Sequence, residues 1–173
     1  CVTSTNGVKV LERIPLDKEI LFVPDYYLGS YLKATTKRNI HLWKGYCPAH
    51  AAILPEQVDH LREAHPDAEF LMHPECGCTT KQMDLADQVL STEGMVQYVK
   101  RSPAKEFIVA TETGLLNRLR TQYPQKTFYP ASEHATCHHM QRNTLEKAFL
   151  SLVKMQHVVT VDPKIAERAV RPI

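Results

Sequence analysis

The stretch FIVATETGL (residues 107–115) places a short apolar run directly before a helix start, and this pattern decides the fold class. Comparable runs predict further buried strands at 20–23, 40–42, 69–72 and 158–161. Helical periodicity lies between the runs, at 6–12, 55–65, 80–87, 92–100, 115–123 and 143–154. Short, nearly all-apolar strands that alternate with helices are typical of parallel sheets covered on both faces. The sequence therefore predicts an α/β fold.

The composition excludes several classes of protein. The chain has 173 residues, of which 43% are hydrophobic, enough for one ordinary domain or two small ones. Acidic and basic residues are interspersed and the formal net charge is +2, so no basic stripe points to nucleic acid. No apolar run approaches the roughly 18 residues that span a bilayer, and the first residues lack the pattern of a secretory signal. We expect a cytoplasmic protein that binds neither nucleic acid nor membrane.

The first residue is Cys1, and residues 1–4 read as the end of a strand. We therefore expect a piece of a longer protein that lacks its N-terminal part. The other cysteines are Cys47, Cys76, Cys78 and Cys137, too few and too dispersed for a small disulfide scaffold. In the reducing compartment that we expect, ligation of a metal or a cluster is the better interpretation of some of them.

The order of features in the first half recurs in the second. A Ser-Thr pair opens a helix at 4–5 and again at 91–92, and a strand, an acidic residue and a second helix follow each time. Cys47 and Cys137 close the two series and lie 137 − 47 = 90 residues apart. This period is longer than that of solenoid repeats and predicts a duplicated small domain. We expect one domain at 1–88 and another at 89–173, the latter with a C-terminal segment.

His73-Pro74-Glu75-Cys76 directly follows a predicted strand, where open α/β sheets place their ligands. His73 and Glu75 share one side of an extended segment, so an imidazole and a carboxylate lie together. Such a pair can exchange protons with a substrate, and the carboxylate can raise the pKa of the imidazole. The alternative is an ordinary polar end of a strand.

Cys47 lies in W-x-G-x-C-x-x-H, on a loop between a strand and a helix. This position suits a ligand, although a buried structural thiol is the common alternative, and His50 fits a polar surface residue. Cys76-Gly77-Cys78 is a weak metal signal, because closed zinc sites usually combine two C-x2-C pairs. If Cys47 and Cys137 bind one cofactor, they must converge from different domains.

Ser4 and Thr92 lie at junctions between a strand and a helix. Hydroxyl groups and free amide groups at such positions favour an anion such as a carboxylate or a phosphate. The alternative is ordinary helix capping.

Seven motifs in order resemble those of quinolinate synthase along essentially the whole chain. They are T-S-x-N-x-V-K, F-x-P-D-x-x-L-G, W-x-G-x-C-x-x-H, H-P-E-C, A-D-x-x-x-S-T, A-T-E-x-G and C-x-x-M. The resemblance implies homologous small three-layer αβα domains about a pseudo-threefold axis, each supplying one cysteine to a central [4Fe-4S] cluster. Residues 1–88 and 89–173 then correspond to the second and third domains.

The resemblance also assigns roles by motif. It implies that Cys47 and Cys137 ligate the cluster, with a third cysteine about 43 residues upstream by extrapolation of the period. It implies that Ser4, His73, Pro74, Glu75 and Thr92 contact substrate, with His73 and Glu75 as the catalytic proton carriers. Cys1, Cys76 and Cys78 fall outside the ligand positions.

The implied reaction belongs to NAD biosynthesis and condenses iminoaspartate with dihydroxyacetone phosphate to quinolinate, releasing phosphate and water. In such a cluster, protein thiolates bind three of the four irons. The fourth iron has no protein ligand and can act as a Lewis acid. The resemblance also implies a functional link to the enzyme that supplies iminoaspartate. Because one ligand and one domain are missing, we expect the chain alone to be inactive.

Two alternatives remain open at this point. The chain can be a non-catalytic zinc-binding module that uses Cys76, Cys78, His138 and His139. It can also be a relative in fold that carries no cluster, although the regular spacing of Cys47 and Cys137 argues against this.

Overall fold

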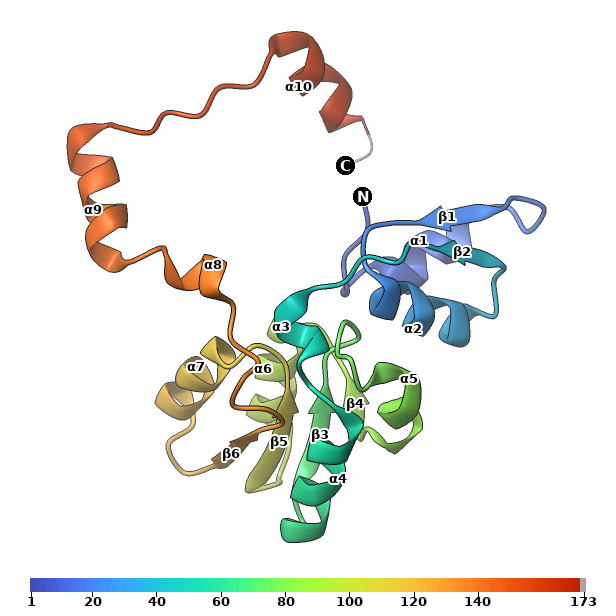
Figure 1. Cartoon of the computed structure of the whole chain (residues 1–173), viewed down its shortest axis with the longest axis vertical. Coiled ribbons are helices and arrows are strands. Elements are labelled where there is room, and N and C mark those ends of the chain that lie inside the picture. The colour runs from blue at the N-terminus through green and yellow to red at the C-terminus, as the bar shows by residue number, and fades with distance from the viewer. Residues whose placement is uncertain (172–173) are drawn as a thin grey trace. The chain divides into compact units, whose positions relative to one another are not determined.

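The computed structural model describes residues 1–171. The chain divides into two compact units, one formed by Val2–Thr136 and the other by Cys1 together with the residues from Cys137 onward. Figure 1 traces the order of the elements along both units.

Strands and helices alternate along the unit Val2–Thr136. Its strands are β1 (Ile20–Phe22), β2 (Ile40–Leu42), β3 (Glu69–Met72), β4 (Gln88–Val89), β5 (Glu106–Ala110) and β6 (Thr127–Pro130). Its helices are α1 (Gly7–Arg13), α2 (Tyr26–Thr36), α3 (Pro48–Ala51), α4 (Pro55–Ala64), α5 (Thr79–Gln82), the 3-10 turn η1 (Met83–Leu85), α6 (Thr92–Arg101) and α7 (Gly114–Gln122). All strand pairs in this unit are parallel, which confirms the predicted α/β class.

The larger sheet has the strand order β4-β3-β5-β6 and is covered on both faces. Successive residues of a strand point to opposite faces, so Phe70 and Met72 pack with Val58 of α4, whereas Leu71 packs with residues of α6 and α7. β5 alternates in the same way and is buried throughout from Phe107 onward. This part of the chain is a three-layer αβα structure, as predicted.

The smaller sheet pairs β1 with β2, in a register that sets Ile20 opposite Ile40. Leu11 of α1 and Leu32 of α2 pack on one face together with these strand residues. On the other face Leu21 is 71% exposed, so within residues 2–136 this sheet is covered on one side only. The expectation of two covered faces is therefore wrong for this sheet.

The repeat is visible in the positions of the elements. The second unit contains α8 (His138–Gln141), α9 (Leu145–Lys154) and α10 (Pro163–Val170). α8 begins 138 − 48 = 90 residues after α3, and α9 begins 145 − 55 = 90 residues after α4. Cys47 and Cys137 are the residues immediately before α3 and α8, both with extended backbone angles. The two cysteines thus occupy equivalent places in two copies of one pattern.

The larger sheet crosses the expected domain boundary between residues 88 and 89. β3 precedes this boundary, whereas β5 and β6 follow it and belong to the same sheet. The two compact units divide at another position, between Thr136 and Cys137.

The predicted strand at 158–161 is wrong. Val158, Val159 and Val161 are 77%, 87% and 58% exposed and form no regular element. A strand needs a neighbouring strand for its backbone hydrogen bonds, and the described residues of the second unit contain no strand that could pair with residues 158–161.

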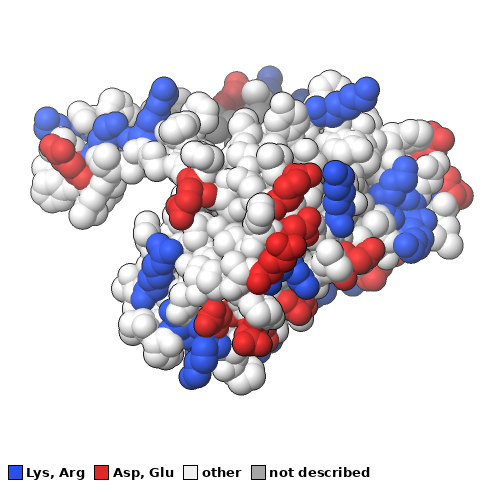
Figure 2. All heavy atoms as spheres, turned by 60° about the horizontal axis from the view of Figure 1, so that its bottom comes forward, with Lys and Arg blue, Asp and Glu red and all other residues white. Residues whose placement is uncertain are grey.

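On the face drawn in Figure 2, acidic and basic side chains are interspersed, which agrees with the pattern of charges along the sequence. Within residues 1–171 none of the helices combines the length and the apolar character needed to traverse a bilayer.

Candidate active site

A cavity of about 690 Å³ lies at the carboxyl ends of β1, β2 and β3. Parallel strands present the loops that follow them at one edge of a sheet, which is where open α/β folds place their ligands. The residues that line the cavity include Ser4, Asp25, Cys47, His50, His73 and Glu75. Four of these were predicted as site residues, and Asp25 and His50 were not.

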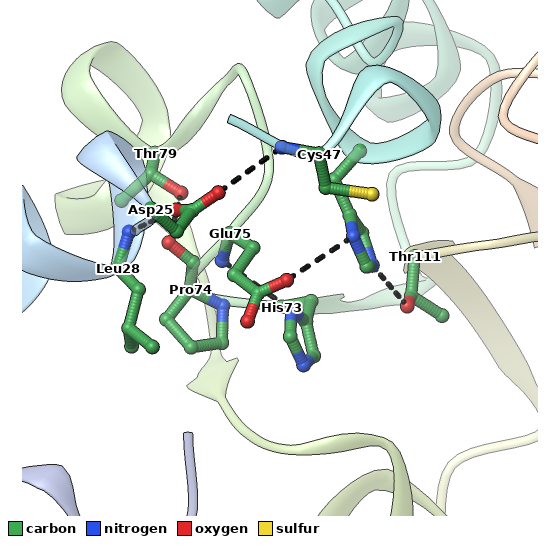
Figure 3. Close-up of polar contacts among 9 residues, drawn as sticks. Asp25, Leu28, Cys47, His73, Pro74, Glu75, Thr79 and Thr111 are labelled. Atoms are coloured by element: carbon green, nitrogen blue, oxygen red, sulfur yellow. Dashed lines mark hydrogen bonds and ion pairs between the residues drawn. The ribbon is translucent and has the colours of Figure 1, made fainter. Parts of the chain in front are cut away.

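Cys47 precedes α3 and is half-buried, and its sulfur is not in a disulfide. Its backbone N–H donates a hydrogen bond of 3.1 Å to Oδ2 of Asp25 (Figure 3). The loop that carries the thiol is thus held from the turn after β1.

Asp25 fixes this loop from a buried position. Its Oδ1 accepts a hydrogen bond of 2.8 Å from the N–H of Leu28 and so caps α2, while Oδ2 binds Cys47. The adjacent Tyr26 N–H donates to the carbonyl of Gly45 at 2.7 Å. A side chain at Gly45 would stand 2.5 Å from the carbonyl oxygen of Pro24, so the close approach of the two loops requires glycine. Asp25 is the aspartate of the motif F-x-P-D-x-x-L-G, but the sequence does not show that both of its carboxylate oxygens accept hydrogen bonds.

His73 follows β3 and is only 5% exposed. Burial, the larger cause, and the nearby His50 together lower the pKa of its imidazole to about 3. The shift is opposite to the upward shift that a neighbouring carboxylate can cause, because burial disfavours the charged ring. The backbone N–H of Glu75 donates to Nδ1 of His73 at 3.3 Å. A neutral ring that accepts at Nδ1 carries its proton on Nε2, so His73 can donate a hydrogen bond there.

Glu75 has the opposite shift. Burial raises the pKa of its carboxyl group, and the negative charge of Asp25 adds to the effect. Its side chain is 25% exposed and lines the cavity, so a bound molecule can reach it. A carboxylate with a raised pKa takes up a proton more readily, as a general base must.

His50 lies on α3, one helical turn after Cys47, and is not the surface residue that the sequence suggested. Its side chain is 12% exposed, and burial lowers the pKa of its imidazole. The ring stacks on that of His73 with centroids 4.6 Å apart and planes 12° from parallel. Nδ1 lies 3.5 Å from Oε2 of Glu75, and Nε2 lies 3.0 Å from Oγ1 of Thr111 (Figure 3). The spacing C-x-x-H was the available signal.

The donor atoms of His50, His73 and Glu75 all lie within 4.8 Å of one another, a separation that metal sites also show. A metal ion lies in the plane of each imidazole that binds it. Because the two rings are stacked nearly parallel, one ion cannot lie in both planes without a rotation of a ring. The geometry favours proton handling over metal binding at this cluster.

The other predicted substrate contacts lie in different surroundings. Ser4 is half-buried and lines the cavity. Pro74 is buried, and its carbonyl accepts a hydrogen bond of 3.1 Å from the hydroxyl of Thr79. Thr92 is exposed at the first position of α6 and is not among the residues that line the cavity. The hydroxyl that caps α6 belongs to Ser91 and accepts from the N–H of Gly94 at 3.2 Å.

The remaining cysteines divide into two kinds. Cys76 and Cys78 are fully buried and joined in a disulfide, so their sulfurs are not thiolates ready to bind zinc. The zinc module proposed as an alternative therefore lacks two of its four ligands. Cys137 lies in the other compact unit, so its expected approach to Cys47 stays a prediction.

A three-layer α/β fold with a thiol, two imidazoles and a carboxylate at its strand ends defines an enzyme-like α/β domain. The model of the family "Quinolinate synthetase A protein" matches residues 1–173. The chain belongs to this family.

Curated relatives named quinolinate synthase match nearly the whole chain. That of Thermus thermophilus is 49% identical over 175 residues, which cover 100% of this chain and 56% of the relative. The relative from Pyrobaculum aerophilum is 46% identical, and the match covers 96% of this chain and 56% of the relative. The relative from Methanosarcina barkeri is also 46% identical, and the match covers 98% of this chain and 55% of the relative. The chain spans about half the length of the relatives that it matches.

Proposed function

We propose that the full-length protein is a quinolinate synthase, which condenses iminoaspartate with dihydroxyacetone phosphate and releases phosphate and water. Membership of the family supports the reaction. The observation that carries the proposal is one cavity lined by Cys47, His73 and Glu75, each predicted to act in this chemistry. An enzyme that oxidises aspartate would supply the imine.

Cys47 and Cys137 are the proposed ligands of a [4Fe-4S] cluster in this chain. The surroundings of Cys47 fit such a group, because its thiol lines the cavity and its loop is fixed by Asp25. The equivalent place of Cys137 in the repeat supports the second assignment. When bound, the cluster would supply a Lewis-acidic iron.

Glu75 is the proposed general base and acid. Formation of the imine and the later loss of water both require protons to be removed and returned. Its raised pKa suits this exchange.

His73 is the proposed hydrogen-bond donor. With a pKa of about 3 the ring stays neutral near pH 7, so it does not deliver a proton as an imidazolium. Its Nε2–H can instead stabilise negative charge on a carbonyl or carboxylate oxygen of the substrate. Ser4, which lines the cavity, can add a hydroxyl donor. Substrate contacts by Pro74 and Thr92 remain predictions.

The test is an anaerobic assay of the full-length protein, loaded with iron and sulfide. Iminoaspartate is generated in the reaction mixture, dihydroxyacetone phosphate is added, and quinolinate is measured by mass spectrometry. We expect quinolinate only when both substrates are present. A folded protein that holds its cluster and forms no quinolinate would refute the proposed function.

A further inference from the structure

His50 connects three parts of the fold at the candidate site. It lies on α3, the helix that Cys47 precedes, and its ring reaches the residues that follow β3 and β5. Thr111, directly after β5, is 1% exposed, so its hydroxyl is placed by the packed sheet rather than by solvent. Thr111 contacts Nε2 of the ring at 3.0 Å and Glu75 faces Nδ1 at 3.5 Å, and dashed lines in Figure 3 mark both contacts.

We propose that Thr111 and His50 are positioning residues that hold the carboxyl group of Glu75 in its working orientation. Thr111 contacts the imidazole at Nε2 at 3.0 Å, and Nδ1 on the other side of the ring faces Oε2 of Glu75 at 3.5 Å. This inference rests on the proposed function of Glu75 as the proton carrier.

The direction of the hydrogen bonds follows from the chemistry of the end groups. An ionised carboxylate can only accept, so the nitrogen that faces Glu75 must carry the proton of the neutral ring. Nε2 then has a free lone pair and accepts from the hydroxyl of Thr111. His73 has the other arrangement, since its Nδ1 accepts from a backbone N–H. The two stacked rings therefore carry their protons on different nitrogens.

Nδ1 of His50 is a buried atom without a completed hydrogen bond among the described residues. Such an atom is costly unless a partner approaches, and Oε2 of Glu75 faces it at 3.5 Å. Asp25 and Glu112 also act on the ring through their charges. Catalytic hydrogen bonds are commonly long before substrate binds, so closure of the 3.5 Å gap completes the chain.

The position of His50 is itself secured by the backbone. Its carbonyl accepts a hydrogen bond of 3.0 Å from the N–H of Gly77, in the loop that follows Glu75. The rings of His50 and His73 pack face to face, which limits rotation of the imidazole. Both contacts favour the orientation in which Nε2 faces Thr111 and Nδ1 faces Glu75.

The kinetic experiment compares variants of the full-length protein. Thr111→Val keeps the shape and removes the hydroxyl, and we expect kcat to fall about tenfold with little change in KM. Thr111→Ser keeps the hydroxyl and should stay within about threefold of wild type. His50→Ala should lose about a hundredfold, and the double variant should lose no more than His50→Ala alone, because both act through one chain of contacts.

Thr113→Val is the matched control. Its hydroxyl contacts that of Thr136 at 3.0 Å and does not contact His50, so its kcat should stay within about threefold of wild type. An equal loss in Thr111→Val and Thr113→Val would overturn the proposal, since it would indicate a general effect on packing. Additive losses in the double variant would also overturn it.

A measurement without substrate separates this inference from the proposed reaction. The ring nitrogens of His50 in the 173-residue chain can be followed by 15N NMR near neutral pH. We expect a protonated Nδ1 and a bare Nε2 in the wild type, and loss of this fixed tautomer in Thr111→Val but not in Thr113→Val. A proton on Nε2 in the wild type would overturn the inference, whether or not the full-length protein forms quinolinate.

Discussion

His73 is placed at the end of β3, where its ring is 5% exposed and stacks on a second imidazole. Both surroundings oppose a positive charge, and together they bring the pKa to about 3. The unfolded chain holds its imidazole near the ordinary pKa of about 6.5. Between these values the unfolded state binds one more proton than the folded state.

Acid should therefore destabilise the chain through His73. As pH falls from 6.5 toward 3, this residue should lower the free energy of unfolding by about 1.4 kcal/mol per pH unit. His73→Asn removes the titrating group, so its stability should depend less steeply on pH. Urea unfolding of both chains at pH 6.5, 5.5 and 4.5 measures the difference. Parallel pH dependences would contradict this, because they would show that folding does not lower the pKa of His73.

Replacement of Glu75 by glutamine removes the proton carrier and keeps the shape of the side chain. We expect Glu75→Gln to reduce kcat at least about a hundredfold in the full-length protein, while the iron and sulfide content stays unchanged. Glu56→Gln is the control, because Glu56 is 70% exposed on α4. Parallel loss of cluster and activity in Glu75→Gln would instead indicate a structural role.

The sequence identified His73, Glu75 and Cys47 because each follows an apolar run that is a strand. It missed Asp25 and His50, because the contacts that bring them to the cavity join residues far apart in sequence: Asp25 with Cys47, and His50 with Thr111. The sign of the pKa shift of His73 also depends on burial, which no local pattern reveals.

At the scale of elements, α3 lies against the loop that follows β3, and Gly77 makes this approach possible. A side chain at Gly77 would stand 2.8 Å from the carbonyl oxygen of Ala51 and 3.0 Å from that of Ile53. These are backbone atoms and cannot swing aside as a flexible side chain can.

Gly77→Ala should therefore lower the free energy of unfolding by about 1–3 kcal/mol, as overpacking does. We also expect slower quinolinate formation, because α3 carries His50. Thr80→Ala, at an exposed position of the same region, should change stability by less than about 0.5 kcal/mol. Urea unfolding of wild type, Gly77→Ala and Thr80→Ala measures the two changes in stability. Equal stability of Gly77→Ala and wild type would contradict the packing argument.

The start of α6 separates a capping hydroxyl from a proposed substrate contact. Ser91→Ala should cost about 1 kcal/mol, because its hydroxyl oxygen caps the N–H of Gly94. Thr92→Ala should change stability by less than about 0.5 kcal/mol. If Thr92 contacts substrate in the full-length protein, its removal should raise KM, and an unchanged KM would end that assignment.

Most elements followed the predicted periodicity to within a few residues, because their apolar faces are buried in the unit Val2–Thr136. Residues 158–161 are the exception. Their β-branched side chains have high strand propensity, yet propensity is expressed only where a neighbouring strand accepts the backbone hydrogen bonds. Propensity alone cannot supply that partner.

At the scale of the whole molecule, the repeat connects the sequence to the proposed cofactor. Two short helices 90 residues apart are each preceded by a cysteine with extended backbone angles. The spacing was readable in the sequence, and the matching helices α3 and α8 agree with it. The pairing of the strands could not be predicted from the sequence, because the larger sheet joins strands from both sides of the expected domain boundary.

The central claim is that Cys47 and Cys137 hold one iron–sulfur cluster beside Glu75 and His73. The most direct measurement is the iron and sulfide content of the full-length protein, purified and reconstituted without oxygen, with its visible absorbance. We expect about four irons and four sulfides per chain in the wild type and in Cys1→Ser, and a large loss in Cys47→Ser and in Cys137→Ser. Wild-type iron, sulfide and absorbance in both Cys47→Ser and Cys137→Ser would contradict the account.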